Sequence, residues 1–155
     1  VARIDAPARD DLRSLTLPPK FLHIGAHSIL REDAPLLHGL QLMSEVLSVE
    51  ECYRLPVAGS EFVALFGCST MEGLETGGAL LAFQSACLLA GAQRVLASLW
   101  PAADDATAAW ISHFYPLIAS GHGVPQAVQR TQMALLADPE FAHPALWAAF
   151  ASSRR

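Results

Sequence analysis

Two apolar segments of this 155-residue chain each end at a side chain that can do chemistry. Residues 21–27 end at His27, and residues 62–68 end at Cys68. Continuous runs of large apolar residues with polar neighbours predict buried strands of a parallel sheet that is covered on both faces. Ligands of such sheets bind beyond the carboxyl ends of the strands, so we expect the imidazole and the thiol to face each other there. An imidazole beside a thiol can take its proton and leave a thiolate, which is the attacking species in nucleophilic catalysis.

Strands and helices alternate along the rest of the chain. Residues 79–90 are apolar on most sides and precede Gly91, which predicts a largely covered helix with a glycine at its C-terminal end. Residues 94–100 predict a third strand, which ends at Pro101. This alternation indicates the α/β class, with right-handed crossovers around one mainly parallel sheet.

Weaker signals suggest the remaining elements. Ser48 followed by Glu51 has the form of a capping box, which predicts a short helix that ends near Pro56. Asp104 or Asp105 can cap a helix that follows the third strand and ends at Gly121. We also expect a strand at 1–4, a helix at 9–15, a hairpin or packed loop at 35–42, a helix at 125–137 and a closing strand at 147–151.

The composition limits the class of protein. With 52% hydrophobic and 16% charged residues, the chain is long enough for one buried core, so we expect residues 1–155 to form a single domain. The formal net charge is −5, and the only basic cluster is at residues 154–155, which argues against a nucleic-acid partner. The apolar stretch 78–92 contains polar residues and is shorter than the roughly 20 residues of a membrane span. We therefore expect no membrane partner.

The cysteines and histidines give no sign of a metal site. Cys52, Cys68 and Cys87 are irregularly spaced and form no C-x-x-C pair, which argues against a disulfide framework and a zinc site. The histidines also lack ligand-like spacing. We interpret Cys87 as a core helix residue, Cys52 as a packed or solvated helix residue, and His23 as a core or pocket-wall residue. Odd cysteine usage of this kind favours a reducing compartment, and we expect a cytoplasmic location.

The second half of the chain resembles a known family. Residues 76–83 (TGGALLAF) and 88–101 (LLAGAQRVLASLWP) are similar to the characteristic stretch of CHAT domains, which are caspase-like bacterial modules. The likeness extends to residues 104–107 (DDAT) and 143–150 (HPALWAAF), and it covers roughly residue 21 to the end. The resemblance implies a three-layer caspase-like fold, of which this chain would lack some N-terminal strands. It also implies a helical-repeat sensor region, such as tetratricopeptide repeats, as a candidate partner. Because the chain begins with Val1 rather than Met, we expect it to be the C-terminal part of a longer protein.

The resemblance also assigns roles to individual residues. It makes His27 and Cys68 the catalytic dyad, in the order found in the clan of caspases, separases and gingipains. An α/β amidotransferase places its histidine after its cysteine, so the order distinguishes the two classes. The backbone N–H groups of Ser28 and Cys68 would hold the oxyanion. In this clan the loop after the third strand forms part of the substrate pocket.

That loop makes Trp100, Asp104 and Asp105 candidate substrate-binding residues, although either aspartate can simply cap the next helix. The function predicted is a cysteine endopeptidase that hydrolyses peptide bonds in a protein substrate without a metal or a cofactor. The alternative is a catalytically silent interaction or signalling module. It is suggested by Ser28, where the family generally has Gly, and by the sequence FGCST at 66–70, where SACET is common.

Overall fold

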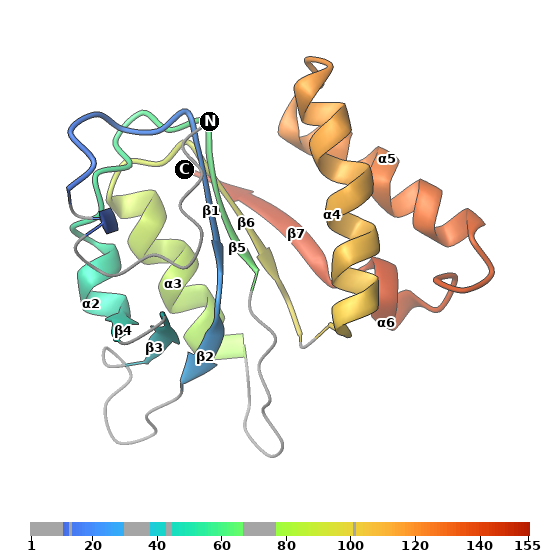
Figure 1. Cartoon of the computed structure of the whole chain (residues 1–155), viewed down its shortest axis with the longest axis horizontal. Coiled ribbons are helices and arrows are strands. Elements are labelled where there is room, and N and C mark those ends of the chain that lie inside the picture. Colours follow the sequence, from blue (N-terminus) through green and yellow to red (C-terminus); the bar gives the residue numbers. More distant parts are fainter. Residues whose placement is uncertain (1–10, 13, 30–37, 43–44, 67–76, 101) are drawn as a thin grey trace.

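A four-stranded sheet forms the centre of the molecule (Figure 1). In the computed structural model, the described residues are 11–12, 14–29, 38–42, 45–66, 77–100 and 102–155. The strands of this sheet, in spatial order, are β1 (Phe21–Gly25), β5 (Phe62–Phe66), β6 (Arg94–Ser98) and β7 (Phe150–Arg154). The first three run parallel, and β7 runs antiparallel to β6. This arrangement confirms the expected α/β class with a mainly parallel sheet.

The strands differ in how deeply they are buried. All five residues of β5 are buried, as its continuous apolar run predicts. In β1, by contrast, Leu22 and Ile24 are buried while His23 and Gly25 are exposed. The expectation that residues 21–27 form one strand buried on both faces is therefore wrong, because β1 is one of the two edge strands of the sheet as described and ends at Gly25.

A second, smaller sheet follows β1 directly. It is antiparallel and contains β2 (His27–Ile29), β3 (Gly39–Gln41) and β4 (Val46–Ser48). A Cβ atom at Gly39 would lie 2.0 Å from Cγ1 of Val46, so any other residue there would force the Val46 side chain to move. The described part of the expected hairpin or loop at residues 35–42 is thus the middle strand of this sheet.

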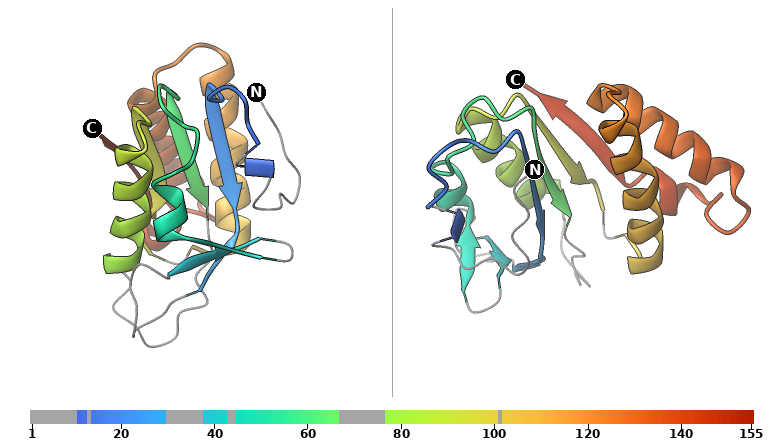
Figure 2. Two further views of the ribbon diagram at one scale, coloured as in Figure 1. Left: turned by 90° about the vertical axis from the view of Figure 1, so that its left-hand side faces the viewer. Right: turned by 45° about the horizontal axis from the view of Figure 1, so that its top comes forward.

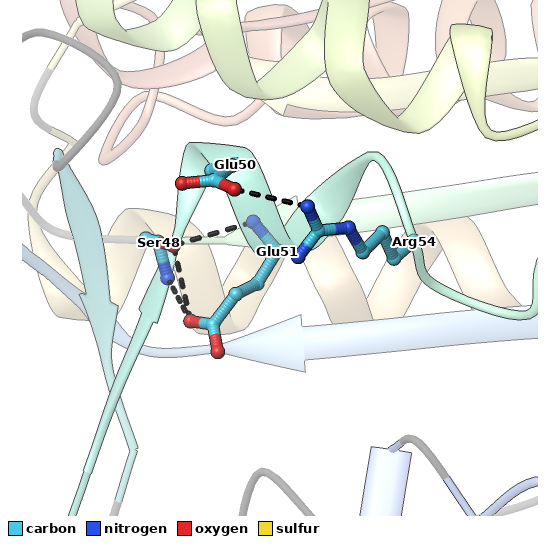
Figure 3. A network of polar contacts seen from close by, with 4 residues as sticks. All are labelled: Ser48, Glu50, Glu51 and Arg54. Atoms are coloured by element: carbon cyan, nitrogen blue, oxygen red, sulfur yellow. Dashed lines mark hydrogen bonds and ion pairs between the residues drawn. The ribbon is translucent and has the colours of Figure 1, made fainter.

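The helix α2 (Val49–Cys52) begins at the predicted capping box (Figure 3). The Glu51 N–H donates to Ser48 Oγ at 3.2 Å, and the Ser48 N–H donates to Glu51 Oε2 at 2.9 Å. An ion pair between Arg54 and Glu50, 3.0 Å long, lies beside it. The helix ends at Cys52, earlier than expected, so the capping box determines where α2 starts but not its length.

The helix α3 (Gly77–Leu89) covers one face of the central sheet together with α2 (Figure 1). It is followed by Gly91 at φ 105°, which confirms the predicted C-terminal glycine. A Cβ atom at this position would approach Cα of Ala58 to 2.9 Å. Leu81 and Leu89 are 60% and 64% exposed, so the expectation that the helix is covered on most sides is wrong on its outer side.

The opposite face is covered by α4 (Asp104–Ala119) and α5 (Val124–Ala137), as Figure 2 shows. Gly121 ends the α4 segment at φ 90°, and Pro125 lies in the first turn of α5, as predicted. The N-cap of α4 is Ala103, without a side-chain cap hydrogen bond. The expectation that Asp104 or Asp105 occupies the cap position is therefore wrong. Both lie in the first turn, where a negative charge favours the positive end of the helix dipole.

The two ends of the chain differ from expectation in different ways. The expected strand at 1–4 lies outside the described residues, and of the expected helix at 9–15 only residues 11–12 are seen in helical conformation. The closing strand is present, but it begins at Phe150 because a short helix, α6 (Pro144–Trp147), precedes it. His143 caps this helix by accepting a hydrogen bond from the Ala145 N–H at 3.2 Å.

Candidate functional site

His27 lies at the carboxyl edge of the central sheet. The parallel ladder between β1 and β5 ends with Gly25 opposite Phe66, and the Ala26 N–H donates to the Phe66 carbonyl at 3.0 Å. His27 is the next residue. It begins β2, opposite Gln41, rather than ending β1, and its side chain is exposed. The chain thus changes sheets at Ala26, which leaves the His27 imidazole at this edge facing solvent.

The other residues predicted for the dyad and the oxyanion site are Cys68 and Ser28. Cys68 lies outside the described residues, which stop at Phe66 on this side of the gap. Ser28 belongs to β2, where it pairs with Leu40. The roles assigned to Ser28 and Cys68 therefore stay predictions.

The predicted substrate-binding residues follow the end of β6. Trp100 is half-buried, its indole N–H donates to the Ala145 carbonyl at 2.9 Å, and its ring packs against the core on the α4 side. Asp104 and Asp105 are exposed in the first turn of α4. Asp105 accepts a hydrogen bond from the Ala106 N–H at 2.7 Å. Two exposed carboxylates and one anchored indole thus come from the segment that continues β6 beyond the sheet.

A second histidine, His23 on β1, makes a close polar contact with α4. The Nδ1 atom of His23 and the hydroxyl of Tyr115, on α4, are 2.5 Å apart. The imidazole also stacks on Phe66, with ring centroids 4.9 Å apart and an interplanar angle of 11°. Although part of His23 reaches solvent, desolvation by these rings lowers its pKa from 6.5, and burial raises the pKa of Tyr115. The pair is therefore a neutral imidazole bound to a neutral phenol.

Of this pair, the sequence pattern indicated His23 but not Tyr115. His23 was expected to be a core or pocket-wall residue, and its position two residues before Gly25 places it on the same face of β1 as that glycine. Tyr115 is 92 residues away in the chain, and no local signal connects the two. The contact exists because α4 packs across the face of the sheet that carries Phe66.

Cys52 and Cys87 lie together in the core on the α3 side. Both thiols are fully buried and form no disulfide. A hydrogen bond with Cys87 and burial together raise the pKa of the Cys52 thiol well above its usual range. Because both thiols are fully buried, a substrate cannot reach them, so these two cysteines do not compete with Cys68 as candidates for catalysis.

The described ranges also bear on metal binding and on membrane insertion. Nowhere in them do three or more His, Cys, Asp or Glu side chains come together in a way that could hold a metal ion. Within the same ranges, no helix has both the length and the hydropathy that crossing a membrane requires.

Comparison with known proteins gives one family and two mammalian relatives. A family model described as the CHAT domain matches residues 2–155. Tetratricopeptide repeat protein 28 of Homo sapiens is 31% identical over 119 residues, which is 76% of this chain and 4% of that protein. Its counterpart in Mus musculus is 30% identical over 90 residues, or 58% of this chain and 4% of that protein. The chain thus spans about 4% of the length of these relatives. The expected bacterial origin stays a prediction.

Proposed function

We propose, from the premise that this chain belongs to the CHAT domain family, that it is a cysteine endopeptidase with Cys68 as nucleophile and His27 as general base. One observation carries the proposal: Gly25 and Phe66 are register partners at the ends of two parallel strands. His27 and Cys68 each follow one of these partners by two residues. The segments that lead to His27 and Cys68 therefore leave two adjacent strand ends at the carboxyl edge of the sheet.

The length of the two connections supports this pairing. One residue extends a chain by at most about 3.6 Å, so His27 and Cys68 are tethered to adjacent strand ends by about 7 Å each. His27 is exposed at this edge.

The proposed reaction is acyl transfer through a thioester. His27 takes the proton of the Cys68 thiol, and the thiolate attacks the carbonyl carbon of a peptide bond. The backbone N–H groups of Ser28 and Cys68 stabilise the oxyanion that forms. His27 then protonates the leaving amine, and water hydrolyses the thioester to release the second product and the free thiol.

Substrate binding is assigned to the segment after β6. Trp100 supplies an aromatic surface whose orientation is set by its hydrogen bond to the Ala145 carbonyl. Asp104 and Asp105 supply exposed negative charge to basic side chains of a protein substrate. Because the relatives are named for tetratricopeptide repeats, we include such a helical-repeat region among the proposed partners.

The test is a cleavage assay on a peptide library, with products identified by mass spectrometry. We expect the native chain to cleave a subset of peptides and Cys68→Ala to cleave none. His27→Ala should lower the rate by about 10²- to 10⁴-fold, since a positioned general base contributes roughly that much. His113→Ala removes an exposed histidine on α4 and serves as the matched control. Cleavage that survives in His27→Ala at the native rate would contradict the proposal.

A catalytically silent module is the second candidate, favoured by Ser28 at a position where the family generally has Gly. Alkylation by iodoacetamide at neutral pH separates it from a peptidase. In the peptidase, Cys68 reacts fastest and His27→Ala slows it, because the imidazole maintains the thiolate. Cys52 and Cys87 are buried and provide slow internal references. In a silent module, the rate at Cys68 is the same with and without His27.

A further inference from the structure

His23 is fixed from two sides and yet partly open to solvent. Phe66 of β5 supports one face of its imidazole, and the Tyr115 hydroxyl of α4 holds Nδ1 at 2.5 Å. Tyr115 also lies against the ring, with centroids 5.7 Å apart at 37°. These contacts define the ring orientation before any ligand arrives, so little conformational entropy is lost when the ring binds one.

The hydrogen bond to Tyr115 determines which ring nitrogen carries the proton. Both groups are neutral, and a phenol hydroxyl is a better donor than a neutral imidazole N–H, while an imidazole nitrogen is the better acceptor. We therefore assign the hydroxyl as donor to Nδ1 of His23. The ring proton then resides on Nε2, which becomes a hydrogen-bond donor.

The Nε2 atom lies beside the bare backbone of Gly25. A Cβ atom added there would lie 3.6 Å from Nε2 of His23 and 3.9 Å from the Phe66 carbonyl oxygen. Apart from Gly25 and its two neighbours in the chain, no other atom of the described residues comes within 4 Å of that point. A glycine lets another backbone approach closely, so a ligand chain can reach Nε2 over this position.

We propose that His23 is a substrate-contacting residue whose Nε2–H donates a hydrogen bond to a carbonyl oxygen of a peptide that crosses Gly25 on the α4 side of β1. The proposal rests on the proposed function in that it takes a polypeptide as the ligand. Gly25 precedes His27 by two residues, which corresponds to about 7 Å of extended chain. The contacted carbonyl therefore lies about two substrate residues from the bond under attack.

The test measures binding in a chain that cannot cleave. A displayed library of random dodecapeptides is selected on the Cys68→Ala protein, and the dissociation constants of enriched peptides are measured by fluorescence anisotropy. In that background, Gly25→Ala fills the space next to Nε2, and His23→Asn removes the Nε2 group. Gly123→Ala is the matched control, because a Cβ atom there meets no described residue beyond its chain neighbours within 4 Å, and Gly123 has φ −65°.

We expect His23→Asn and Gly25→Ala each to raise the dissociation constant by about tenfold, as loss of one hydrogen bond predicts. The control should change it by less than about twofold. NMR of the [¹⁵N]histidine-labelled Cys68→Ala protein gives a readout that does not depend on how the variants fold. Added peptide should shift the Nε2 resonance of His23 and leave that of the exposed His113 unchanged.

The outcomes of these experiments distinguish failure of the His23 proposal from failure of the peptidase proposal. If no peptide is enriched, or if enriched peptides bind all variants equally and leave the Nε2 resonance unmoved, the role of His23 is overturned. If peptides bind in a His23-dependent way but the native chain does not cleave them, the peptidase proposal fails and the binding site stands. If the native chain cleaves peptides that bind independently of His23, the role of His23 is overturned and the peptidase proposal stands.

Discussion

The two faces of the central sheet are packed with different kinds of side chain. On the face covered by α2 and α3, the core is mostly aliphatic and contains two thiols; its members include Leu22, Ile24, Val63, Leu65, Val95, Cys52 and Cys87. On the face covered by α4 and α5, it is rich in aromatic rings; its members include Phe62, Phe66, Trp110, Phe114 and Phe150. Rings on this second face make close pairs, such as Trp110 with Phe114 at 4.8 Å.

This difference has a consequence for the candidate site. Aliphatic side chains and buried thiols offer no polar group to a ligand, so the α3 face mainly holds the fold together. Tyr and His have an apolar body and a polar tip, and they can pack in a core while reaching its border. The pair formed by His23 and Tyr115 is of this kind, and it lies on the aromatic face. The polar groups that a ligand could contact near the strand ends therefore lie on the α4 side of the sheet.

Truncation of a core ring gives the largest expected effect. Phe114 is fully buried, so Phe114→Ala should lower the free energy of unfolding by roughly 3–5 kcal/mol. Val63→Ala, its counterpart on the aliphatic face, removes two carbons and should cost about 2 kcal/mol. Urea denaturation of both variants measures the difference. Equal losses would show that the two faces do not differ in the way their composition indicates.

A buried hydroxyl on the aromatic face allows a stabilising change. The Oγ1 atom of Thr131 is fully buried and has no hydrogen-bond partner within the described part of the chain. Thr131→Val keeps the shape and removes the unsatisfied polar atom, so we expect the free energy of unfolding to rise by about 1 kcal/mol. Thr107→Val, at a half-buried position of α4, serves as a control. A loss of stability in Thr131→Val would mean that the hydroxyl makes a favourable interaction.

The smallest expected effect is a change in how the free energy of unfolding depends on pH. Desolvation lowers the pKa of His23 from 6.5, so the unfolded chain takes up a proton at a higher pH than the folded chain does. The free energy of unfolding should therefore fall as the pH drops through about 6.5 and below, and His23→Asn should remove that part of the slope. Denaturation at about pH 7.5 and about pH 5.5 measures it. An unchanged slope in His23→Asn, with His113→Asn as the control, would contradict the assignment.

Much of the fold could be predicted from local patterns. The described part of the buried strand predicted at 62–68, the capping box at Ser48 and the glycine after α3 were all found as expected. Each depends on residues within a few positions of one another, which is why a linear reading detects them. The end of α2 and the N-cap of α4 were not predicted correctly, because tertiary packing as well as local capping residues determines where a helix starts or stops.

Side-chain types and their order along the chain determined the α/β class, the family and the identity of the candidate dyad. Only the tertiary structure decided that β1 ends at Gly25, that His27 belongs to a second sheet, and that Tyr115 meets His23. The physical reason is the separation along the chain over which each kind of interaction acts. Periodicity and capping act between neighbours in the sequence, whereas strand order and the packing of α4 across the sheet join residues that are distant along the chain.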